Sequence, residues 1–161
     1  MDELREHIVA LLPRLRRFAY GLAGKQEDAD DLVQAACERA LERAAQWTPG
    51  TRLDSWLFRI IQTIWLDQLR ARKVRGDAVD PDDLVHIADE QAHRVPEARH
   101  RLDRVMQAMA QLPEEQREVL MLVCVEEHSY REAAELLEIP LGTVMSRLAR
   151  ARQRLQDLTG E

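Results

Sequence analysis

The sequence is poor in the residues that build disulfide scaffolds, irregular loops and β-sheets. Two of its 161 residues are cysteines, and glycine and proline occur six times each. Cys37 and Cys124 lie far apart within apolar helical patterns, so we expect buried free thiols and no disulfide or metal site. Runs in which β-branched and polar residues alternate, as in half-buried strands, are hard to find. These absences predict an all-α protein.

Apolar residues are plentiful, but they form no long uninterrupted segment. Hydrophobic residues make up 45% of the chain, which is enough for packed cores and too many for a disordered protein. The start of the chain, with Asp2, Glu3 and Arg5, is charged and unlike a signal peptide, and no stretch is long enough to span a membrane. We therefore expect a cytoplasmic protein that does not insert into membranes.

Charge is unevenly distributed along the chain, whose formal net charge is −6. Residues 1–75 contain 13 Lys and Arg against 11 Asp and Glu, and residues 98–161 contain nine against eleven. Residues 76–97 contain one against seven, so this segment alone accounts for an excess of six acids. Because local patches decide phosphate contacts, the net charge does not exclude a nucleic-acid partner.

The acidic middle segment, residues 76–97, has the composition of a linker. It contains Gly76, Pro81 and a run of aspartates, with little apolar periodicity. It separates two predicted helical domains, residues 1–75 and residues 98–161. Each of these domains is small enough to be marginally stable alone.

Apolar residues follow helical spacing in both domains. In the first domain the spacing predicts helices over about 8–19, 29–45 and 54–75, the last capped by Asp54 or Ser55. In the second domain it predicts helices over about 96–111, 113–123, 130–137 and 143–155, the third capped by Ser129.

The last two predicted helices are separated by a short turn at residues 138–142, which is the helix-turn-helix arrangement. The final helix has an apolar rear stripe and an arginine face, and no acid occurs from Ile139 through Gln156. Such a helix suits entry into the major groove of DNA. The alternative is a solvated basic helix end whose arginines complement the helix dipole, and the missing acids count against it. The expected duplex-binding residues are Leu141, Gly142, Thr143, Met145, Ser146, Arg147, Arg150 and Arg154.

A second basic cluster lies at the end of the first domain. From Arg59 to Arg75 there are five basic residues and one acid, and a loop with a tryptophan and an arginine lies just upstream. Aromatic and basic groups side by side are what a single-stranded nucleic acid needs. Trp56 and Trp65 are interpreted as core residues, since tryptophan is usually largely buried. The expected strand-binding residues are Trp47, Arg52, Arg59, Arg70, Arg72 and Lys73, and the alternative for the basic tail, which also includes Arg75, is a contact with polymerase.

No arrangement typical of catalysis is present. The five histidines are scattered, and there is neither a glycine-rich phosphate loop nor a metal-ligand spacing. We therefore expect a non-enzymatic protein that needs no cofactor.

Three stretches of the chain resemble the extracytoplasmic-function (ECF) group of bacterial RNA polymerase sigma factors. Together they span nearly the whole chain, in the order and spacing of that family. They are residues 27–34 (EDADDLVQ); residues 56–60 (WLFRI) with 66–70 (LDQLR); and residues 112–119 (LPEEQREV) with 129–134 (SYREAA) and 142–148 (GTVMSRL).

The resemblance implies a two-domain sigma factor that binds core RNA polymerase, recognises promoter DNA and promotes strand opening. The second stretch would grip the melted minus-ten element, which adds Thr63 and Asp67 to the strand-binding residues. The third would read the duplex minus-thirty-five element and lean on the polymerase flap. A stress or envelope-type regulon and an anti-sigma factor would complete the system. The first stretch would dock on the clamp helices of the polymerase largest subunit through Asp28, Asp30, Asp31, Leu32 and Gln34.

The chain departs from the family pattern at a few positions. Thr63 stands where the family usually has Asn, and Ala35 and Cys37 replace the usual acid and aromatic residue. Glu138 occupies the turn where Gly is common, and a positive φ there would cost about 1 kcal/mol. None of these departures removes a charge from the arginine face.

Two other functions stay open from the sequence. A sigma mimic that sequesters an anti-sigma factor would share the fold, although such proteins tend to lose their basic faces. A free-standing helix-turn-helix regulator would use the first domain as a sensor or dimeriser, and would protect an operator without polymerase.

Overall fold

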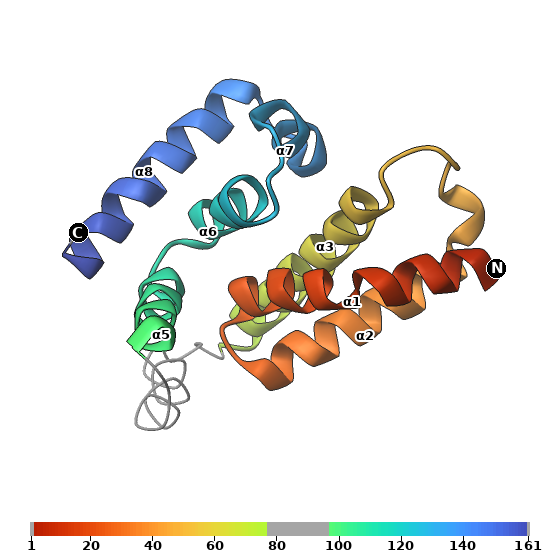
Figure 1. Cartoon of the computed structure of the whole chain (residues 1–161), viewed down its shortest axis with the longest axis horizontal. Helices are drawn as coiled ribbons and strands as arrows, with labels where there is room; N and C mark the ends of the chain where they lie inside the picture. The colour runs from red at the N-terminus through yellow and green to blue at the C-terminus, as the bar shows by residue number, and fades with distance from the viewer. Residues whose placement is uncertain (1, 77–96, 161) are drawn as a thin grey trace.

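The computed structural model describes residues 2–76 and 97–160, so the predicted linker lies almost entirely outside the described residues. The described residues form helices and contain no strand, which confirms the all-α prediction (Figure 1). None of the described helices combines the length and the hydropathy of a membrane span.

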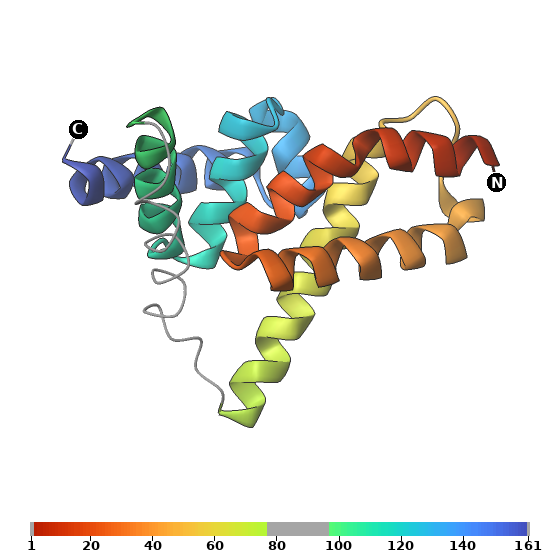
Figure 2. The same cartoon turned by 60° about the horizontal axis from the view of Figure 1, so that its bottom comes forward.

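The first domain consists of α1 (Asp2–Ala23), α2 (Gln26–Glu42), a 3-10 turn η1 (Ala44–Gln46) and α3 (Leu53–Arg75). α1 and α2 lie side by side as a helical hairpin, and α3 packs across both (Figure 2). Buried apolar side chains from all three helices form the core, where the rings of Phe18 and Phe58 are 4.8 Å apart. The last turns of α3 extend beyond this core (Figure 2).

The second domain consists of α5 (Glu97–Ala110), α6 (Glu114–Leu120), a π-helical turn η2 (Met121–Val125), α7 (Tyr130–Leu137) and α8 (Leu141–Thr159). The Ser129 side chain accepts a hydrogen bond from the Glu132 amide and completes a capping box, which confirms the predicted cap. Val144, Leu148 and Ala151 are buried, which confirms the apolar rear stripe of the last helix.

Some local predictions are wrong. α3 begins at Leu53, so neither Asp54 nor Ser55 is its N-cap, and the carboxylate of Asp54 is instead bound by arginines. Both cysteines are free, as expected, but neither is fully buried: Cys37 is half-buried and Cys124 is exposed. Cys124 lies on η2, where the Glu126 amide donates to the Met121 carbonyl five residues earlier, so the 3.6-residue periodicity used to bury it does not apply.

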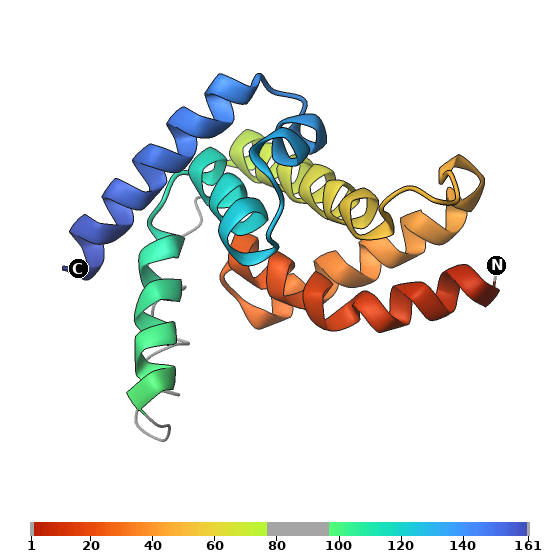
Figure 3. The same ribbon diagram turned by 45° about the horizontal axis from the view of Figure 1, so that its top comes forward.

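The two domains pack against each other and share one continuous apolar core. α1 contacts α5, α6 and η2, and α3 contacts α7. Gly21 permits the close approach, because a Cβ atom there would lie 2.4 Å from the Sδ atom of Met121. α6 and α7 lie between the first domain and α8, so α8 forms an outer face of the molecule (Figures 1 and 3).

Candidate nucleic-acid interface

The predicted duplex-binding residues gather on the first four turns of α8. Leu141, Gly142, Met145 and Ser146 are exposed, as are Arg150 and Arg154, whereas Thr143 is half-buried. The exception among the arginines is Arg147, which is half-buried and has its Nη2 atom 3.1 Å from a carboxylate oxygen of Glu115 on α6. This face therefore offers apolar and hydroxyl groups at its amino end and two accessible guanidinium groups further along.

The predicted strand-binding residues of the first half of α3 lie around two shallow grooves. Arg59 and Trp56 line both grooves. The first groove, of about 230 Å³, lies between α2 and α3 and also includes Thr63. The second, of about 390 Å³, lies between α3 and α7 and also includes Arg52. A half-buried indole beside guanidinium groups is a suitable surface for an unstacked base and its phosphate.

The first groove contains two arginines that the sequence analysis missed, Arg39 and Arg43. Arg39 lies in the last turn of α2 and Arg43 directly follows it. The sequence analysis assigned only polymerase contacts to this helix. The spacing of four residues places the two arginines on one face of the helix, and this was the signal available in the sequence.

The loop tryptophan Trp47 is half-buried and packs against the core. Its Nε1 atom has no hydrogen-bond partner among the described residues, although it is buried. The interpretation of Trp65 as a core residue is confirmed, since it is 3% exposed. Its Nε1 atom donates to Glu114 across the domain boundary at 2.6 Å.

The basic tail of α3 is not brought together with the grooves. Lys73 lies fourteen residues after Arg59, which corresponds to about 21 Å along a helix. Arg70 is exposed and lies 3.8 Å from the carboxylate of Asp67. Arg72 is half-buried between the Asp28 carboxylate, at 3.8 Å, and the ring of Trp65, at 5.4 Å from its centroid. The tail therefore forms a separate basic site, in which Lys73 and Arg70 are exposed.

The residues expected to contact polymerase divide between the surface of α2 and its core side. Asp30, Asp31 and Gln34 are exposed, and Asp28 is half-buried beside the basic tail. Leu32 is fully buried in the helical core, so its side chain supports the helix and does not reach the surface. A shallow groove between α1 and α2, of about 440 Å³, lies beside these exposed groups and is lined by Asp30 and Gln34.

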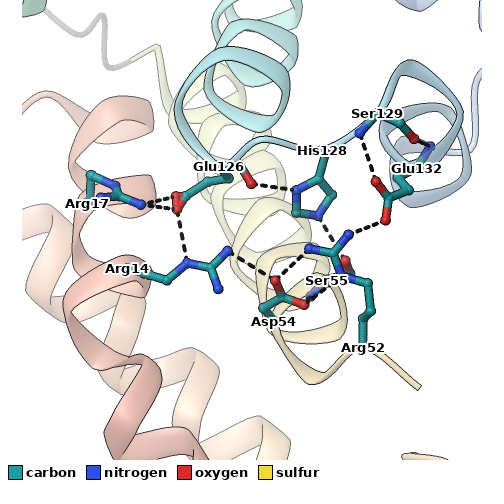
Figure 4. Close-up of polar contacts among 9 residues, drawn as sticks. All are labelled: Arg14, Arg17, Arg52, Asp54, Ser55, Glu126, His128, Ser129 and Glu132. Carbon is teal, nitrogen blue, oxygen red and sulfur yellow. Dashed lines mark hydrogen bonds and ion pairs between the residues drawn. The ribbon is translucent and has the colours of Figure 1, made fainter. Parts of the chain in front are cut away.

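A chain of charged side chains joins the two domains at the amino end of α3 (Figure 4). Arg17 on α1 donates to both carboxylate oxygens of the buried Glu126, at 2.6 and 2.8 Å. Arg14 lies between Glu126 and Asp54, and donates to the latter at 3.0 Å. Arg52 binds Asp54 within the first domain and Glu132 of α7 in the second.

This network changes the ionisation of its acids. Burial opposes ionisation of Asp54, but hydrogen bonds from Arg52 and the Ser55 amide outweigh it and lower the pKa to about 2. Hydrogen bonds from the Ser129 amide and from Arg52 lower the pKa of Glu132 below its usual value. Both carboxylates are therefore held in the charged form that pairs with arginine.

A different acidic pair lies deeper in the boundary, on α6. Burial, followed by the charge of Glu114, raises the pKa of Glu118 to about 7. Its neighbour across the boundary is Gln62 of α3, whose Nε2 atom is 3.4 Å from a carboxylate oxygen of Glu118. Burial also raises the pKa of Glu114, which is paired with Arg117.

Both halves of the chain match sigma-factor domains of known proteins. Residues 102–155 match the family described as Sigma-70, region 4, and residues 8–62 match that described as the Sigma2 domain of PhyR. The chain is 34% identical to the ECF RNA polymerase sigma factor EcfG of Rhodopseudomonas palustris (strain TIE-1), over 98% of this chain and 85% of that protein. The chain belongs to the ECF sigma factors.

This sigma factor is also similar to ECF sigma factors of other bacteria. It is 36% identical to SigE of Mycolicibacterium smegmatis, over 97% of this chain and 60% of that protein. As a member of this family it is a DNA-binding protein of transcription initiation that works with RNA polymerase.

A solved structure shows the same packing of two domains. It is that of the sigma factor RpoE in complex with the anti-sigma factor NepR from Bartonella quintana, with a TM-score of 0.80 and 29% identity over 99% of this chain and 98% of that chain. Because the match covers both domains of each protein, the closed arrangement of our sigma factor resembles that of a relative held by an anti-sigma factor.

Proposed function

We propose that this sigma factor binds core RNA polymerase and divides promoter recognition between its two domains. α8 docks on the duplex minus-thirty-five element, and the grooves around α3 hold the opened strand of the minus-ten element. Polymerase holds the two domains at the separation that the promoter requires. Strand opening is then driven by exchanging base stacking for contacts with protein groups.

The observation that carries this proposal is the exposed face of α8. Met145 and Ser146 are free to reach base edges, and Arg150 and Arg154 are free to reach phosphates. None of the residues from 139 through 156 is acidic, so a phosphate backbone meets no like charge on α8 before Asp157 in its last turn.

The exposed acids of α2, Asp30 and Asp31, are proposed to dock on the clamp helices of polymerase together with Gln34. Nucleotidyl transfer is assigned to polymerase, so this chain acts without catalysis or a cofactor. Its place of action is therefore the cytoplasm, where polymerase and promoter meet.

An anti-sigma factor is proposed as the second protein partner. A solved relative of this chain is a sigma factor in complex with an anti-sigma factor, and the closed arrangement of this chain resembles it. A regulon of the stress or envelope type is proposed on the family resemblance alone.

The proposal is tested by run-off transcription with purified core polymerase on a library of promoter fragments. We expect initiation to depend on the added chain and to fall at least tenfold with Arg150→Glu, because an exposed phosphate contact becomes a repulsion. Arg5→Glu, which reverses an exposed charge on α1, is the matched control and should transcribe normally. If neither core binding nor transcription is found, the chain is a sigma mimic or a free-standing regulator.

A further inference from the structure

In the closed molecule, two arginines of the strand-binding grooves are already bound by acids of the second domain. Arg52 forms an ion pair with Glu132, and Arg59 forms one with Glu138. These acids lie near the start and just after the end of α7, so the helix spans the groove between them. The lining of that groove comes from both domains: Thr51, Arg52, Ser55, Trp56 and Arg59 on one side, and Glu132, Glu135 and Leu136 on the other.

Glu138 holds its position in an unfavourable backbone conformation. Its φ of 57° and ψ of 45° lie in the left-handed region, where a glycine would be relaxed and a glutamate is strained. A glycine here would end α7 equally well but could not bind Arg59. Glu138 therefore has a strained backbone, and its carboxylate forms an ion pair with an arginine of the other domain.

Glu132 combines two tasks. One carboxylate oxygen accepts a hydrogen bond from the Ser129 amide at 2.8 Å and closes the capping box. The other accepts from Arg52. Because the capping box fixes the carboxylate, it is positioned for the arginine before the two domains meet.

Neighbouring contacts hold α7 in place against the amino end of α3 (Figure 4). The buried His128, just before α7, has its Nε2 atom 2.9 Å from the hydroxyl of Ser55. Arg17 of α1 clamps Glu126 two residues earlier. The approach of the carboxylates to Arg52 and Arg59 is therefore part of a defined interface.

The duplex-binding face is arranged differently. It belongs to α8, which lies on the outer side of the molecule (Figure 3), and Met145, Ser146, Arg150 and Arg154 are exposed in the same closed molecule. The closed form thus engages two arginines of the proposed strand-binding surface and leaves the proposed duplex-binding surface open.

We propose that α7 is an intramolecular competitor of single-stranded promoter DNA, with Glu132 and Glu138 in the places of two phosphates. This rests on the proposed function, since it assigns Arg52 and Arg59 to the opened strand. The closed chain binds duplex DNA through α8, whereas binding of the strand to Arg52 and Arg59 requires α7 to move away from α3. Strand capture is thereby delayed until polymerase has drawn the two domains apart.

The test uses the full chain and two fluorescent probes, a randomised single-stranded oligodeoxynucleotide and a randomised duplex. The variant Glu132→Gln/Glu138→Gly removes both carboxylates, keeps a side chain that can complete the capping box and relieves the positive φ. We expect its affinity for the single strand to rise roughly three- to tenfold, because the strand no longer has to displace two partly exposed ion pairs. Its affinity for the duplex should change by less than about twofold.

A matched control separates competition from the general effect of removing acids. Glu127 has a φ of 58° and is exposed, and Glu6 is exposed on α1. Glu127→Gly/Glu6→Gln therefore relieves the same strain and removes the same charge, but releases neither Arg52 nor Arg59. It should bind both probes as the native chain does.

The proposal is overturned if the two double variants bind the single strand equally well. It is also overturned if the release of Arg52 and Arg59 raises affinity for strand and duplex alike. Because the probes are randomised, the assay gives a result whether or not the chain supports transcription. Failure of the run-off assay alone would count against the proposed function, and failure of this assay alone would count against the competition.

Discussion

At the scale of single residues, the structure explains two glutamates that look out of place in turns. Glu127 and Glu138 both have a positive φ. At Glu138 this agrees with the sequence analysis, which noted that glycine is common at that turn. Glu138 binds Arg59, whereas Glu127 is exposed and has no ion pair among the described residues. The two positions therefore carry the same backbone strain with different compensation.

Replacing each of these residues by glycine should separate strain from pairing. Glu127→Gly is expected to raise the free energy of unfolding by about 0.5–1 kcal/mol, because glycine tolerates the left-handed region. Glu138→Gly should gain less, since it also loses the contact with Arg59. Urea denaturation of the two variants measures the difference, and a loss of stability in Glu127→Gly would refute the explanation.

A second residue-scale prediction concerns Glu118, whose pKa is raised from 4.5 to about 7 by burial and then by the charge of Glu114. The folded chain therefore holds this proton more tightly than the unfolded chain does. The contribution of Glu118 to stability is therefore fully present below pH 4.5 and is lost as the pH rises from there through 7. The full shift corresponds to about 3 kcal/mol, which is an upper figure.

Urea denaturation at pH 5 and pH 8 measures this effect, with Glu118→Gln as the comparison. The amide cannot ionise, so the free energy of unfolding of the variant should fall much less between pH 5 and pH 8 than that of the native chain. At pH 8 the variant should therefore be the more stable of the two. An unchanged pH dependence would show that Glu118 is already charged at pH 5. The lowered pKa of Asp54, near 2, acts below this window and does not interfere.

At the scale of helices, apolar spacing was a reliable guide where a helix has one buried face. The stripe at Val144, Leu148 and Ala151 and the cap at Ser129 both follow from local pattern, because helical geometry and capping are local interactions. The start of α3 and the exposure of Cys124 did not follow. The first depends on the binding of Asp54 by the distant Arg14 as well as by the neighbouring Arg52, and the second on a π-helical turn that shifts the register.

The cap of α7 provides the prediction at this scale. Ser129→Ala removes a hydrogen bond of 3.0 Å to the Glu132 amide and should cost about 1 kcal/mol of stability. Ser129→Asp keeps an acceptor at the same place and should cost much less. Ser146→Ala, on the exposed face of α8, is the control for loss of a hydroxyl and should change the unfolding midpoint little.

At the scale of the whole molecule, the sequence predicted two helical groups and candidate DNA-binding residues in each, but neither Arg39 and Arg43 of the first groove nor the mutual arrangement of the two groups. The contacts that close the molecule join residues far apart in the chain, such as Arg17 with Glu126 and Arg52 with Glu132. No periodicity or local motif relates such residues. The same reason explains why Arg59 was identified as a strand-binding residue without its partner Glu138.

The closed arrangement also connects stability with function. Each domain alone is small, and their shared core includes buried residues from α1 through α8. In the proposed mechanism, polymerase therefore has to supply enough binding free energy to replace this interface when it separates the two domains. An anti-sigma factor that favours the closed arrangement would act on the same equilibrium in the opposite direction.

The central claim is that the two domains perform separate steps of promoter recognition, and one measurement tests it most directly. A promoter with 2-aminopurine in its minus-ten element is mixed with holoenzyme, and duplex binding and strand opening are followed on the same sample. Arg150→Glu is predicted to abolish binding, whereas Arg52→Ala/Arg59→Ala is predicted to bind the promoter and fail to open it. If the α3 variant opens the promoter as well as the native chain does, or if both variants lose binding and opening together, the division of labour is contradicted.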